Sequence, residues 1–324
     1  MKRTFIILLG CCLGLNSCYE LDLNPLSQAS SENWYSNETE IEMSIKDFYR
    51  DAFWPLDNED KTDNFIYRET PSEIIKGTFN GQSGDVTTLW ANQYKSIART
   101  NTILSNMDKA AEMGISEEKI KRYEAEALFQ RASCYARLVT YFGDVVYVTS
   151  VVDIEEAFTL GRTPKSEIVP KIYEDYDKAA EGLPEKYTGV SSLRATKGAA
   201  LALKARFALY MGDWEIAADA AKKCMDLGLY KLHADYAELF LTTTKNSEES
   251  IFLLPRSIEY KVTLGNWTVI NEVSRNPGGW GAFAPSWDLL AAYECIDGLP
   301  IDESPLFDPQ NPFKNRDPRC TATI

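Results

Sequence analysis

Histidine is nearly absent from this chain, which has only His233 among its 324 residues. A single imidazole excludes a histidine-rich metal centre, and any Ser/His/Asp triad would depend on that one side chain. His233 follows an alanine-rich predicted helix, in a predicted turn, where we favour a hydrogen-bonded structural histidine over a general base. The sequence therefore predicts no enzymatic activity, no cofactor and no resident metal ion.

Positive charge is also scarce, with 34 Lys and Arg residues against 48 Asp and Glu residues. The net charge of −14 becomes −16 if Lys2 and Arg3, two positive charges, are removed with an N-terminal leader. Repulsion would oppose contacts between such a chain and phosphate groups. We therefore expect no nucleic-acid partner.

Paired cysteine motifs are missing, because none of the seven cysteines forms a CxxC pair. Three of the seven lie within the first 18 residues. Of the rest, Cys134, Cys224 and Cys295 fall inside predicted helices without a histidine-bearing cluster nearby. Such cysteines are expected to be buried free thiols.

The N-terminus has no apolar run long enough to cross a bilayer. Its apolar stretch, residues 5–15, is short, follows Lys2 and Arg3, and is built like a secretory signal. Leu15-Asn16-Ser17-Cys18 matches a bacterial lipobox, so we expect cleavage after a 1–17 leader and acylation of Cys18. Acyl chains there would anchor the protein to a membrane, with residues 18–32 as a polar tether. The alternative is a plain signal peptide with an incidental cysteine.

The most informative stretch is residues 124–144, EAEALFQRASCYARLVTYFGD. Its apolar residues recur on one face of an α-helix, and half of those on the stripe are alanine. Small side chains allow a neighbouring helix to approach closely, so this segment is predicted to be an inner helix. Ser116 is its expected N-cap, and Gly143 is expected to end it.

The end of that helix occurs twice. YARLVTYFGD (135–144) and KARFALYMGD (204–213) share five of ten residues, and we call them the repeated decapeptide. Their offset of 69 residues is about twice the ~34-residue period of tetratricopeptide repeats. The second copy leads directly into an alanine-rich helix, which predicts a compact hairpin at 196–227. The first copy continues as extended chain until a new helix at Pro164, which indicates a hairpin with an inserted excursion.

The remaining chain is less regular. Residues 55–87 carry scattered glycines and predict a long surface loop of the kind that is commonly functional or disordered. A helix is predicted over 88–107, a short strand over 250–257 and a short helix over 286–295. Tetratricopeptide-type helices are thus expected over about 88–228 and a loop-rich lobe over about 229–324. Residues 33–324 are expected to form one domain. The sequence stops without a closing element, so we expect this domain to be truncated at its C-terminus.

Aromatic residues in the loops are the best candidates for ligand contacts. Trp54, Tyr67, Trp267 and Trp280 fall in or beside irregular segments rather than on a periodic apolar face. Flat apolar rings with polar neighbours suit the faces of sugar rings. For each ring the alternative is that it packs its own loop onto the core, but at least one exposed ring is expected.

These features together resemble the SusD/RagB family of nutrient-binding outer-membrane lipoproteins of Bacteroidetes. The motifs that carry the resemblance are Cys18 with YELDLNPLSQASSENWY, then LWANQYKSIARTNTIL, EAEALFQRASCYARLVTYFGDVVYV, PSWDLLAAYECIDGLPI and NRDPRCTATI. The resemblance implies a mainly α fold, in which tetratricopeptide-like hairpins form a platform for an irregular ligand-binding lobe with short strands.

The resemblance also implies a function. Such a protein captures oligosaccharides, or peptides in the RagB-like branch, without breaking a bond, and delivers them to a TonB-dependent SusC/RagA-like transporter. It would be lipid-anchored in the outer membrane and face the cell surface. Two other readings of the sequence are a tetratricopeptide scaffold whose only partner is the transporter, and a helical glycosidase.

Overall fold

The computed structural model describes residues 34–55, 61–68, 70–187, 194–254, 256–259, 261–263 and 266–324, with the backbone alone at 266–268. The predicted leader (1–17), the lipidated Cys18 and the tether (18–32) lie outside these residues.

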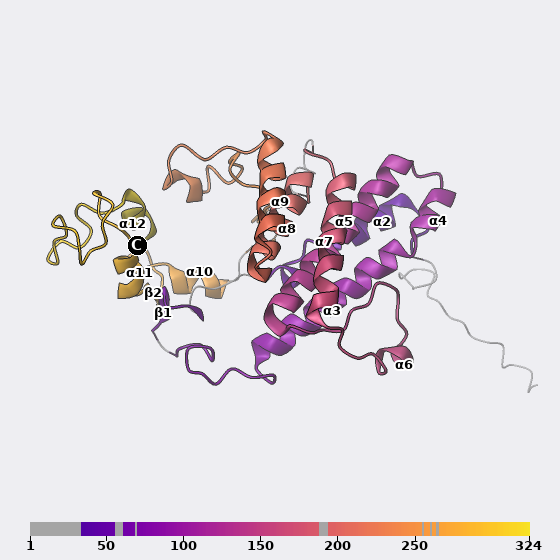
Figure 1. Ribbon diagram of the computed structural model, residues 1–324, viewed down its shortest axis with the longest axis horizontal. Helices are drawn as coiled ribbons and strands as arrows, with labels where there is room; N and C mark the ends of the chain where they lie inside the picture. The colour runs from indigo at the N-terminus through magenta and orange to yellow at the C-terminus, as the bar shows by residue number, and fades with distance from the viewer. Residues whose placement is uncertain are drawn as a thin grey trace, which may run out of the picture.

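The described chain is mainly helical, as predicted, and divides into a helical platform and a looser lobe (Figure 1). The platform contains α2 (Glu38–Asp47), η1 (Asp51–Phe53), α3 (Gly84–Leu104), α4 (Met107–Glu112), α5 (Glu117–Phe142), α6 (Ile154–Ala157), α7 (Lys165–Gly182), α8 (Lys197–Met211) and α9 (Trp214–Asp226). The lobe, after η4 (Glu238–Phe240), contains α10 (Asn266–Glu272), β2 (Phe283–Pro285), α11 (Trp287–Ala292) and α12 (Pro318–Thr323), together with β1 (Phe65–Tyr67) from the N-terminal third.

Helix α5 is the predicted inner helix. The hydroxyl of Ser116 accepts a hydrogen bond from the Lys119 N–H at 3.4 Å, as an N-cap does, and the helix ends at Gly143, whose φ is +68°. Its alanine face is buried, and it packs chiefly against α3 and α7. Small side chains along α5 are thus what lets two helices pack closely against it.

The compact hairpin is also confirmed. Thr196 caps α8 by accepting from the Ala199 N–H, and Gly212 ends it in the left-handed region with φ +82°. Helix α9 starts two residues later and packs back against α8. The left-handed C-terminal glycine reverses the chain without a Cβ penalty.

The segment inserted after the first decapeptide copy, residues 145–163, is called the excursion, and its two ends lie together. Val145 and Thr163 form an antiparallel bridge, so the intervening residues leave and rejoin the platform at one place. Helix α7 starts at Lys165, one residue later than predicted, because Pro164 occupies the N-cap position with an extended ψ. The capping group comes from the Gly-Asp turn instead: the Asp144 carboxylate accepts from the Lys165 N–H at 2.8 Å.

Several details of the predicted secondary structure were wrong; α6, α10 and α12 were not predicted, and α11 ends at Ala292 rather than residue 295. Helix α3 begins at Gly84 rather than residue 88, and α4 was not predicted. The strand expected over 250–257 is absent from the described residues of that range, where Phe252 instead packs its ring 4.9 Å from Trp54 and 5.4 Å from Phe129. An apolar run that packs on helices needs no strand partner, so its hydrophobicity alone was misleading.

The cysteines behave as expected. Cys134, Cys224 and Cys295 are buried and free, as is Cys320. No helix within the described ranges has the length and apolar character needed to cross a membrane.

Candidate ligand-binding site

Trp54 is largely buried in the platform core. It is 8% exposed, and its indole N–H donates to the Phe48 carbonyl oxygen at 2.9 Å. Phe129 stacks at a centroid distance of 5.8 Å, and Phe252 lies against the same ring. This burial favours the core-packing alternative for Trp54, because its ring packs on Phe129 of α5.

Tyr67 and Trp280 belong to neighbouring segments of the lobe, although most of the chain separates them. Tyr67 ends β1, pairs in register with Phe283 of β2, and its ring lies 5.1 Å from the Phe283 ring. Trp280 precedes β2 by three residues and is 37% exposed. The third lobe residue, Trp267, is in helix α10, which packs on β2. Three of the four predicted site residues therefore belong to one small assembly of β1, β2 and α10.

A glycine-rich turn positions Trp280. A Cβ on Gly279 would lie 2.0 Å from the Val273 carbonyl oxygen, so only glycine fits this close approach. Gly278 has φ +100° and Gly281 has φ +51°, which glycine adopts readily. The Trp280 N–H then donates to the Ile270 carbonyl oxygen at 2.7 Å, which fixes the residue against α10.

Backbone hydrogen bonds hold the distant β1 segment in place. The Arg68 N–H donates to the Ala282 carbonyl oxygen at 2.9 Å, and the Ser286 N–H donates to the Asn64 carbonyl oxygen at 2.8 Å. The Ser286 hydroxyl donates to the Asp63 carbonyl oxygen and also caps α11. In Figure 1 the indigo β1 accordingly lies beside the orange and yellow elements of the lobe.

Sequence reasoning missed several side chains of this assembly. Phe283 supports the Tyr67 ring, and Ile66 and Trp287 are more than half exposed on β1 and α11. Their signal was weak because each strand has only three residues, too few for an alternating pattern to stand out.

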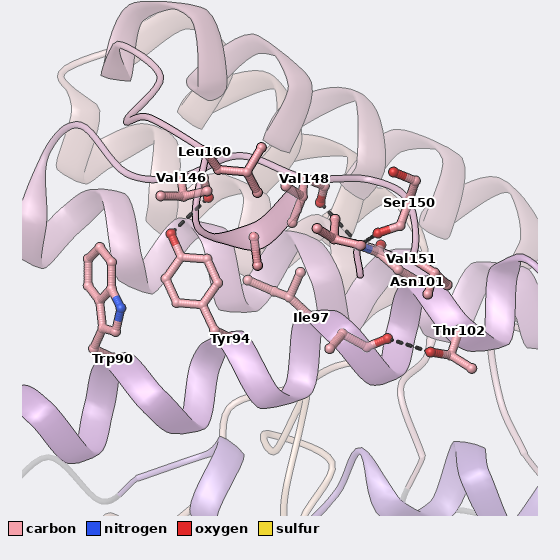
Figure 2. Close-up of a pocket in the computed structure, with 13 residues that line it drawn as sticks. Trp90, Tyr94, Ile97, Asn101, Thr102, Val146, Val148, Ser150, Val151 and Leu160 are labelled. Atoms are coloured by element: carbon pink, nitrogen blue, oxygen red, sulfur yellow. Dashed lines mark hydrogen bonds between the residues drawn. The ribbon is translucent and has the colours of Figure 1, made fainter. Parts of the chain in front are cut away.

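A well-defined cavity lies elsewhere, between α3 and the excursion (Figure 2). It has a volume of about 340 Å³. Trp90, Tyr94 and Ile97 rise from α3 toward the excursion, and the wall is mostly apolar. Two of its polar side chains already have partners: the Tyr94 hydroxyl donates to the Val146 carbonyl oxygen at 2.8 Å, and the Asn101 amide donates to two excursion carbonyl oxygens. Burial raises the pKa of Tyr94. These bonds hold the excursion to α3 and leave little for orienting a polar ligand.

No metal centre or catalytic cluster stands out in the described chain. His233 shares a hydrogen bond with Ser247, between Nδ1 and Oγ at 3.1 Å, in keeping with a structural role. Within the described ranges, no group of three or more His, Cys, Asp or Glu side chains could hold a metal ion. The features that remain are aromatic rings on a loop-rich lobe.

A helical platform with aromatic residues on a loop-rich lobe is the architecture of a helical binding protein. Comparison with known proteins identifies the family. Residues 25–209, more than half of the chain, match the SusD-like family model described as "Starch-binding associating with outer membrane". The chain belongs to this SusD-like family, which confirms the SusD/RagB resemblance.

Individual proteins similar to this chain are also SusD-like. SusD-like protein P2 of Formosa agariphila is 28% identical over 78% of this chain and 52% of its own length. The crystal structure of a SusD-like carbohydrate-binding protein from Bacteroides fragilis superposes with a TM-score of 0.77 at 28% identity, covering 90% of this chain and 60% of that one. A laminarin-binding SusD-like protein shares the fold at 23% identity, with a TM-score of 0.59 over 67% of this chain and 51% of that one. The chain spans about half the length of the curated relatives it matches.

Proposed function

We propose that this protein binds oligosaccharides at the outer-membrane surface without cleaving them, through the lobe assembly of β1, β2 and α10. The observation that carries the proposal is that β1, which ends at Tyr67, pairs with β2, which Trp280 precedes by three residues. The family description and the carbohydrate-binding relative from Bacteroides fragilis support it.

The lobe has the chemistry that sugar recognition needs. An aromatic face packs against the C–H groups of a pyranose ring, and neighbouring polar groups hydrogen-bond its hydroxyls. Phe283 supports Tyr67 from one side, and the turn hydrogen bonds fix the backbone of Trp280. A ring supported like that of Tyr67 loses little conformational freedom on binding. Trp267, on α10, is the third proposed ligand residue.

Anchorage and delivery complete the proposal. Acyl chains on Cys18 would hold the protein on the outer membrane, with the lobe facing the medium. The bound oligosaccharide would pass to a SusC-like TonB-dependent transporter. A membrane-associated family is consistent with this arrangement.

A glycan array probed in parallel with a peptide panel tests the binding function. We expect binding to a defined group of oligosaccharides and recovery of the ligand uncleaved. Binding to peptides alone would place the protein with the RagB-like branch. No binding on either panel by well-folded protein would contradict the proposal and favour the scaffold alternative, and turnover of any oligosaccharide would favour a glycosidase.

A further inference from the structure

The two copies of the repeated decapeptide meet at a cavity in the platform. Each copy carries an arginine followed four residues later by a tyrosine, Arg137 with Tyr141 and Arg206 with Tyr210. All four side chains line one cavity of about 150 Å³, between the C-terminal halves of α5 and α8. The two copies thus contribute matching residues to a single site.

The lining of this cavity is partly aromatic, with Trp54, Tyr176 and Phe207 among its residues. Trp54 lies at its base, and the Arg137 guanidinium carbon is 5.6 Å from the centroid of the indole ring, within cation–π range. One Arg137 nitrogen donates to the Phe53 carbonyl oxygen at 3.1 Å, which fixes the guanidinium in place. The tyrosines of the two copies are 58% and 61% exposed, so they stand at the rim.

The cavity is positively charged in an otherwise acidic protein. Burial raises the pKa of Tyr176 on its wall, and the charges of Arg137 and Arg206, which line the same cavity, oppose that rise. Among the described residues that line the cavity, none is Asp or Glu. Arg206 is exposed, and it has no hydrogen-bond or ion-pair partner within the described ranges. A pair of uncompensated guanidinium groups in a chain of net charge −14 is a local anion site.

We propose that this cavity binds one anionic sugar residue, a uronate, as a second saccharide site on the platform. The guanidinium of Arg206 would pair with the sugar carboxylate, for which its planar fork is suited. The aromatic floor and the rim tyrosines would contact the ring, and the volume fits a single sugar unit rather than a chain. The inference rests on the proposed glycan-binding function and adds selectivity for acidic polysaccharides.

Isothermal titration with an oligogalacturonate and with its fully methyl-esterified form tests the inference. The two ligands share a sugar backbone and differ in charge. We expect the free acid to bind more tightly, with an affinity that falls as salt rises, because the contact is charged. Arg206→Gln should weaken binding of the free acid by about tenfold or more and leave binding of the ester unchanged. Lys222→Gln, which removes one charge from the exposed side of α9, is the matched control and should change neither.

The outcomes separate this site from the lobe. Equal affinity for acid and ester, or no effect of Arg206→Gln on the acid, would overturn the anionic site while leaving the lobe function intact. Preferential binding of a sulfated oligosaccharide that depends on Arg206 would overturn the uronate assignment. Loss of all saccharide binding in Trp280→Ala but none in Arg206→Gln would place recognition in the lobe alone.

Discussion

The guanidinium of Arg131 on α5 donates two hydrogen bonds to the Asp175 carboxylate on α7, from Nε and Nη2, both at 2.8 Å. Both residues are buried. A third arginine nitrogen donates to the Asn101 side-chain oxygen on α3 at 3.3 Å. One buried arginine therefore links the three helices that form the centre of the platform.

Asp175→Asn should destabilise the protein strongly. The substitution leaves a buried guanidinium without its counter-charge, which typically costs about 3–5 kcal/mol of unfolding free energy. Urea denaturation followed by circular dichroism measures the change. Glu174→Gln is the matched control, because its carboxylate pairs with Lys178 in solvent, and we expect no measurable shift. Similar shifts for both variants would contradict a special role for the buried pair.

Gly212→Ala should also lower stability, through the backbone. Gly212 ends α8 at φ +82°, where a Cβ costs roughly 1–2 kcal/mol. No atom lies within 4 Å of the added methyl group, so the effect would come from conformation rather than from a clash. Gly161→Ala is the control, since that position also has open space and no positive φ. Thermal unfolding should show a lower Tm for Gly212→Ala alone.

The platform could be predicted from the sequence largely because its signals are local. The caps at Ser116 and Thr196 and the glycines at 143 and 212 lie next to the helices that they delimit. The lobe could not be predicted in the same way. Its two strands have three residues each and are separated by most of the chain. The burial of Trp54 likewise depends on a contact with Phe252, which is distant in the sequence. Contacts between distant segments leave no periodic pattern in either segment.

Cys134 should be unreactive in the native protein. Burial raises the pKa of its thiol to about 11, and the thiolate is the reactive form. We expect iodoacetamide at pH 8.5 to label it slowly in the native state and rapidly in urea, as measured by mass spectrometry of tryptic peptides. Cys224, Cys295 and Cys320 are also buried and free, and should show the same contrast. Fast native labelling of Cys134 would indicate that α5 opens locally.

Cys18→Ala should release the protein from the membrane. If the proposed acyl chains supply the anchorage, their loss moves the protein to the soluble fraction after cell lysis. Ser17→Ala keeps the cysteine and should leave the protein in the membrane pellet. The comparison should be made in cells without the partner transporter, since a transporter complex could retain the variant. Membrane retention of Cys18→Ala in such cells would rule out the lipid as the anchor.

Trp280→Ala and Tyr67→Ala are the sharpest test of the lobe. Removing a ring that stacks on a sugar should weaken binding of an array-selected oligosaccharide by about 1–3 kcal/mol, with nucleobase stacking as the nearest measured analogue. Trp214→Ala is the matched control, because Trp214 is a tryptophan with 66% exposure on α9 of the platform, outside the β1, β2 and α10 elements. Affinities should be compared with Tm values, so that loss of binding is not confused with loss of the fold. If Trp280→Ala and Tyr67→Ala both bind the ligand as tightly as the Trp214→Ala control, recognition does not involve this aromatic pair, and the site must be sought outside the β1–β2 assembly.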